Sequence, residues 1–75
     1  MTFKYNPEDY ANCDSGYLRK LLLEIYAAYE AKDEVGYEIF RSHITNELKM
    51  LWKSGIISRS EGEEMKDYFW GELSV

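Results

Sequence analysis

The sequence has one cysteine, one histidine and one proline in 75 residues. A single cysteine cannot form a disulfide within the chain, whereas secreted domains of this size commonly need several. The sequence also lacks a run of about 18 apolar residues that would span a bilayer, and residues 1–4 lack the apolar core of a signal peptide. These absences predict a cytoplasmic protein that does not contact a membrane.

Metal ligands and catalytic groups are equally scarce. Cys13 and His43 are the only thiol and imidazole ligands, and a zinc site needs about three or four ligands, so we predict no metal and no cofactor. Asp14 raises rather than lowers the pKa of a neighbouring thiol, and no motif supplies an oxyanion hole. We therefore predict no catalytic residue and no enzymatic activity, with His43 partly buried on a helix.

Positive charge is in deficit, because nine Lys and Arg oppose fourteen Asp and Glu for a net charge of −5. Such a surface repels nucleic-acid phosphates, so direct nucleic-acid binding is not expected. The acidity is compatible with an alternative function, an inhibitor that mimics nucleic acid and blocks a basic groove of a nucleic-acid enzyme. A solvated acidic surface explains the same charge without that function.

What the sequence does have is apolar and aromatic side chains, at 45% and 16% of all residues. That composition predicts a folded chain, and its length predicts a single domain with one core over residues 1–75. No segment alternates like a strand, and apolar residues recur at helical spacing. The predicted fold is all-α, a small three-helix bundle with a short N-terminal helical turn.

Capping residues predict where these elements begin and end. Asn6 and Pro7 start a turn within an N-terminal arm over 1–14, and Phe3 and Tyr5 of this arm are expected to cover the core. Ser15 or Asp14, Asp33 and Ser58 are the predicted N-caps, and Gly55 is a left-handed C-terminal residue. The main helices are predicted over 15–31, 33–54 and 59–73.

The predicted helix 33–54 has apolar residues on two opposite faces. A helix of this kind is typically sandwiched between neighbours, and the sequence leaves open which of its faces is buried. One face holds Tyr37, Phe40, Ile44, Leu48, Leu51 and Trp52. The other holds Val35, Ile39, His43 and Met50.

The aromatic residues are too many for so small a core to enclose. Either the N-terminal arm covers the excess, or some of these side chains form an interface. In helix 59–73 we expect Gly62 to allow close approach of a neighbouring helix and Trp70 to point away from the inner face. We predict a small interaction or regulatory module that binds a protein partner or forms a homodimer. The candidate interaction residues are Val35, Ile39, His43, Met50 and Trp70.

Overall fold

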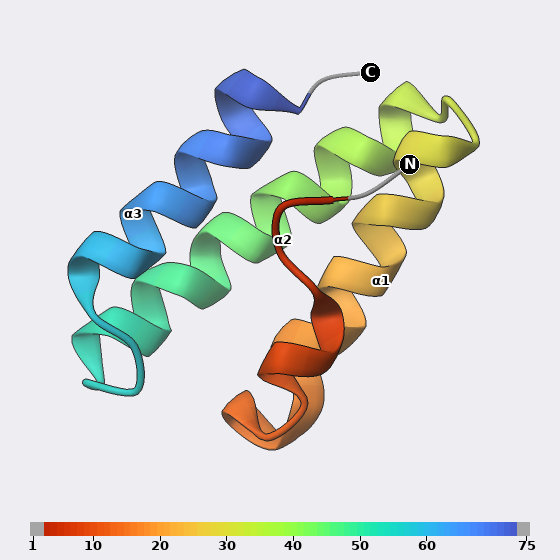
Figure 1. The fold of residues 1–75 in the computed structure, drawn as a ribbon. Helices are drawn as coiled ribbons and strands as arrows, with labels where there is room; N and C mark the ends of the chain where they lie inside the picture. Colours follow the sequence, from red (N-terminus) through yellow and green to blue (C-terminus); the bar gives the residue numbers. More distant parts are fainter. Residues whose placement is uncertain (1–2, 74–75) are drawn as a thin grey trace.

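The structure is a computed structural model that describes residues 3–73, and this range is helical with no strand (Figure 1). It confirms the predicted all-α three-helix bundle with an N-terminal helical turn. Residues 1–2 and 74–75, at the ends of the predicted domain, lie outside the described range. The elements are the 3-10 turns η1 (Pro7–Tyr10) and η2 (Cys13–Gly16), the helices α1 (Tyr17–Glu30), α2 (Glu34–Lys53) and α3 (Arg59–Asp67), and the π-helical turn η3 (Tyr68–Glu72).

Side-chain caps begin η1, α2 and α3 as predicted. Each cap oxygen accepts a hydrogen bond from a backbone N–H of the first turn, which would otherwise have no partner within the helix. At the other end of α2, Gly55 adopts the predicted left-handed conformation, with φ of 78°. The caps and the residues whose N–H they accept are Asn6 with Glu8, Asp33 with Gly36, and Ser58 with Glu61, each at 3.0 Å.

The beginning of α1 differs from the prediction. The helix starts at Tyr17, and neither Asp14 nor Ser15 caps it. Instead Asp14, Ser15 and Gly16 are all left-handed, with φ of 48°, 55° and 83°. This conformation is easy for glycine and unfavourable for other residues. The turn reverses the chain, so that the preceding turn η1 packs against α1 (Figure 1).

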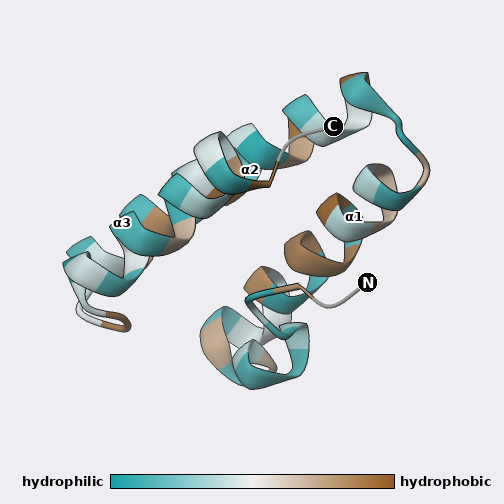
Figure 2. Ribbon diagram, turned by 45° about the horizontal axis from the view of Figure 1, so that its top comes forward, coloured by the Kyte–Doolittle hydropathy of each residue, from teal (hydrophilic) through white to brown (hydrophobic). Residues whose placement is uncertain are grey.

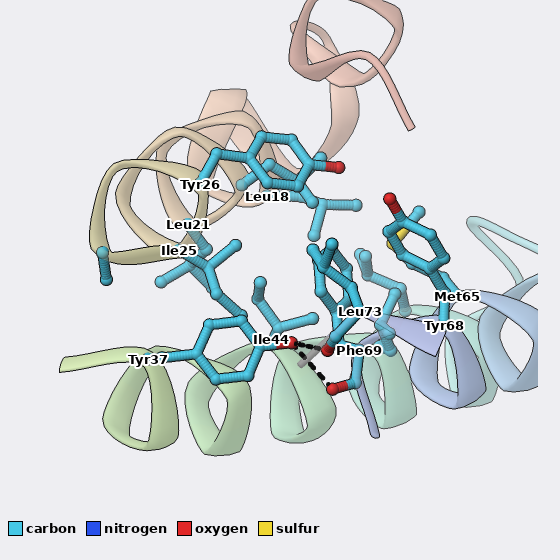
Figure 3. Packing of buried hydrophobic residues seen from close by; sticks show 14 residues of the cluster. Leu18, Leu21, Ile25, Tyr26, Tyr37, Ile44, Met65, Tyr68, Phe69 and Leu73 are labelled. Carbon is cyan, nitrogen blue, oxygen red and sulfur yellow. Dashed lines mark hydrogen bonds between the residues drawn. The ribbon is translucent and has the colours of Figure 1, made fainter. Parts of the chain in front are cut away.

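Helix α2 lies between α1 and α3 and packs against both (Figure 1). Hydrophobic residues are concentrated on α1, whereas the ribbons of α2 and α3 are mostly hydrophilic (Figure 2). As expected, Gly62 lets α3 approach α2 closely, against the ring of Trp52. The buried core consists of Leu18, Leu21, Leu22, Ile25, Tyr26, Ala28, Tyr37, Ile44, Leu48, Leu51, Met65, Tyr68, Phe69 and Leu73 (Figure 3).

The prediction of one continuous α-helix over 59–73 is wrong in its last part. It changes at Tyr68 into a π-helical turn, in which the N–H of Leu73 donates to the carbonyl of Tyr68 at 2.7 Å. The hydroxyl of Tyr37 donates toward the carbonyls of Phe69, at 2.9 Å, and of Leu73 (Figure 3). The single proton of this buried hydroxyl is thus shared between two carbonyls at the helix end, where carbonyls lack partners within the helix.

The N-terminal arm covers one side of this core, as expected. Phe3 stacks on Tyr26 with ring centroids 3.9 Å apart, and the Tyr26 hydroxyl donates to the carbonyl of Tyr5 at 2.6 Å. The Tyr5 ring meets Tyr68 edge-on at 5.3 Å. These contacts hide much of the aromatic surface that the three helices alone would expose. Within residues 3–73, no helix combines the length and apolar character needed to cross a membrane.

Candidate functional site

The four apolar-face residues Val35, Ile39, His43 and Met50, here called the α2 stripe, lie on the solvent side of α2. Val35, Ile39 and Met50 are 69%, 49% and 51% exposed, and His43 is exposed rather than partly buried as expected. At about 100° per residue, these positions lie opposite the core residues of the same helix. The structure therefore answers the question left open by the sequence: the Tyr37 face is buried, and no described residue sandwiches the stripe.

Trp70, the fifth predicted interaction residue, lies apart from the α2 stripe. Its indole stacks on the guanidinium of Arg41, 3.9 Å from the ring, and its Nε1–H donates to Thr45 Oγ1 at 2.8 Å. Arg41 and Thr45 lie on a different face of α2, by helical spacing. Trp70 is half exposed, and its contacts fix η3 against α2. Its place in an interface stays a prediction.

A pocket of about 240 Å³ opens at one end of the α2 stripe. A water molecule takes up about 30 Å³ in the liquid. The pocket is several times larger than that, which is enough room for one side chain. His43 and Met50 belong both to the stripe and to the pocket wall, so the two form a continuous surface. The full lining is Tyr17 at the start of α1, with His43, Asn46, Glu47 and Met50 of α2.

Glu47 in the pocket wall is a buried carboxylate that pairs with no cationic side chain among the described residues. The residue is only 4% exposed, its Oε2 has no hydrogen-bond partner, and none of the ion pairs among the described residues includes it. Burial and, to a smaller extent, a side-chain hydrogen bond with the neighbouring Asp14 carboxyl and the negative charge of that carboxyl raise the pKa of Glu47 from its ordinary 4.5 to about 7. A buried ionised carboxylate is unfavourable unless a cation or hydrogen-bond donors compensate it.

The left-handed turn before α1 places Asp14 and Cys13 beside this carboxylate. Burial, followed by the negative charges of Glu47, Asp14 and Glu61, raises the pKa of the Cys13 thiol. A thiol surrounded by negative charge is a poor nucleophile, because less of it is thiolate. Asp14 raises the pKa of the Cys13 thiol, as the sequence predicted. The cluster concentrates negative charge beside the pocket.

Sequence reasoning missed Glu47 and the relation of Asp14 to it. A signal was present, because Glu47 lies within the buried face of α2, three residues after Ile44 and four before Leu51. A charged residue at such a position is rare unless it is paired.

In residues 3–73, no three His, Cys, Asp or Glu residues are grouped so as to hold a metal ion.

A scan against protein-family models gave no matching family, and searches of curated proteins and of solved structures gave no match.

Proposed function

We propose that this protein is a small non-enzymatic interaction module that binds a protein partner through the α2 stripe. One observation carries the proposal: a single helix packs one apolar face against the core and exposes Val35, Ile39 and Met50 on the opposite side. Val35 and Met50 are separated by fifteen residues, or about 22 Å of helix at 1.5 Å per residue. Isolated exposed apolar residues are ordinary, but apolar residues that recur along one side of a helix are typical of interaction surfaces.

The charge of the chain favours a different protein over a second copy. Self-association through the stripe would bring together two chains of net charge −5 each, which repel one another. A partner with basic residues around an apolar patch would instead be attracted to the same surface. We therefore propose a basic partner that places an apolar surface or helix along α2.

Site-specific photocrosslinking from the α2 stripe tests this function. A photoreactive amino acid at Ile39 or Met50 should give the same discrete product in cells of the source organism. The matched control places it at Glu24, on another helix, where no such product should form. The crosslinked protein is then identified by mass spectrometry and purified, and its affinity for the wild-type chain is measured. No shared product from the two stripe positions would contradict the proposal.

The salt dependence of that affinity separates the proposal from the acidic-inhibitor alternative. An interface built on apolar burial should lose only its charge attraction and still bind between about 0.1 M and 1 M salt, while charge mimicry should lose its affinity as the screening length falls from about 10 to 3 Å. Replacing Val35 with Asp should weaken apolar docking and have little effect on charge mimicry. A steep salt dependence together with normal binding by Val35→Asp would favour the acidic inhibitor.

A further inference from the structure

The pocket between the start of α1 and the middle of α2 is chemically different from the stripe it adjoins. Its walls include the ring of Tyr17, which is 45% exposed, and the side chain of Met50. Its buried carboxylate, Glu47, has an oxygen without a hydrogen-bond partner. An apolar wall beside a buried carboxylate is complementary to a long side chain that carries a positive charge at its tip.

We infer that this pocket receives one lysine or arginine side chain of the protein partner, whose cationic group pairs with the Glu47 carboxylate. The inference rests on the proposed function, because it assigns the pocket to the same partner that covers the α2 stripe. The apolar stem of the side chain lies against Tyr17 and Met50. The charged tip takes the place of the proton that lies between the Glu47 and Asp14 carboxyls and compensates the buried negative charge.

The charges around the pocket support this occupant. Asp14 lies beside Glu47 and raises its pKa, and Glu61 acts on the adjacent Cys13 thiol in the same sense. Without a partner, protonation of Glu47 relieves the mutual repulsion of these carboxylates. A bound cation replaces that proton. The ionised pair then attracts the partner to the pocket. It also favours a cationic side chain over an uncharged one, since an uncharged side chain leaves the Glu47 carboxylate without a cation.

The test is an NMR titration of the purified protein with small probes at about pH 8. N-acetyl-lysine amide and N-acetyl-arginine amide are compared with N-acetyl-norleucine amide, which has an apolar stem and no charge. We expect saturable shifts of the amide signals of Tyr17, His43 and Glu47 with at least one of the two charged probes and none with the uncharged one. Charge-assisted hydrogen bonds predict about tenfold weaker binding to Glu47→Gln, or more.

Glu38→Gln is the matched control, because it removes the same charge from an exposed position on the same helix. It should bind the charged probes like the wild type, which separates the pocket from the general acidity of the chain. Circular dichroism establishes that both variants remain folded. Equal shifts with all three probes, equal binding by Glu47→Gln, or the same shifts with MgCl₂ alone would each overturn the inference.

The result also distinguishes this inference from the proposed function. If neither charged probe binds but crosslinking from Ile39 and Met50 persists, the pocket inference is wrong and the interaction module stands. If a probe binds but no partner is crosslinked, the proposed function fails, and with it the assignment of the pocket to a partner's side chain.

Discussion

Gly62 of α3 lies directly against the indole ring of Trp52 of α2. A Cβ atom at position 62 would overlap Trp52 Cε3 and would lie 2.9 Å from Cζ3. The absence of a side chain at Gly62 therefore sets how closely the two helices pack. This contact also holds α2 in place while its opposite face stays exposed.

Replacing Gly62 with Ala should destabilise the protein, although alanine is the better helix former. The helical gain is about 1 kcal/mol, and overpacking against a ring costs about 1–3 kcal/mol, so we expect a net loss of about 1 kcal/mol. In a domain of this size that loss lowers the melting temperature by about 4–8 °C. Thermal unfolding followed by circular dichroism measures it.

Gly71 provides the control for that substitution, because a Cβ there would meet nothing within 4 Å. Gly71→Ala should leave the melting temperature unchanged or raise it slightly. A Gly62→Ala variant that is as stable as Gly71→Ala would show that the Trp52 ring moves aside freely.

Ile39 and Ile44 allow the two faces of α2 to be compared with one residue type. Ile39 is 49% exposed and Ile44 is 1% exposed. Ile39→Asp should change the free energy of unfolding by no more than about 0.5 kcal/mol, as surface substitutions do. Ile44→Asp should prevent folding, since it buries an unpaired charge in a core of marginal stability. Urea unfolding measures both variants.

Light scattering of the wild type and of Ile39→Asp over a concentration series completes this experiment. The charge argument predicts a monomer for both proteins at physiological salt. A wild-type dimer that Ile39→Asp converts into a folded monomer would identify a second copy of the chain as the occupant of the α2 stripe. That result would contradict the proposed heterologous partner.

Trp70 should contribute to stability more than to partner binding. Trp70→Ala removes the stack on Arg41 and the hydrogen bond to Thr45, worth about 0.5–1 kcal/mol for an exposed cation–π pair and about 1 kcal/mol for the hydrogen bond. Trp70→Phe keeps an aromatic ring over Arg41 and should lose roughly the hydrogen bond alone. Urea unfolding followed by circular dichroism gives both values. Loss of crosslinking from Ile39 in a Trp70→Ala protein of unchanged stability would instead place Trp70 in the interface.

Local signals predicted most of the fold. Asn6, Asp33, Ser58 and Gly55 set element ends through hydrogen bonds and dihedral angles within a few residues of themselves. The spacing of apolar residues in α2 separated its two faces correctly for the same reason. What the sequence left open was which face is buried, because that depends on α1 and α3.

The predictions failed where distant parts of the chain decide the structure. Asp14 and Ser15 are both good N-caps by residue type, but packing of the arm against α1 requires a left-handed turn at these positions. The π-helical turn after Asp67 accepts a hydrogen bond from the Tyr37 hydroxyl of another helix, a contact that the local sequence does not reveal. Glu47 was visible as a charge on a buried face, whereas its proximity to Asp14 arises only from the fold.

The raised pKa of Glu47 predicts how stability depends on pH. Because the folded protein holds the Glu47 proton up to about pH 7, the contribution of this group is fully present below about pH 4.5 and is lost as the pH rises through 7. Glu47→Gln has no such loss. One pKa unit corresponds to about 1.4 kcal/mol, and we reduce the resulting free energy because part of the pocket is open to solvent. We therefore expect Glu47→Gln to be more stable than the wild type by about 2 kcal/mol at pH 8. At pH 4.5 the variant should have no such advantage.

Urea unfolding at several pH values between 4.5 and 8 measures this difference. Asp14, Cys13 and His43 also lie at or beside the pocket, so the comparison is made in a His43→Asn background, which removes the imidazole from the pocket wall. Glu38→Gln in that background controls for the change in net charge and should not show the pH-dependent gain. A constant difference between Glu47→Gln and its parent across the range would mean that the folded protein keeps Glu47 ionised, and the buried carboxylate would then have to be stabilised by solvent within the pocket.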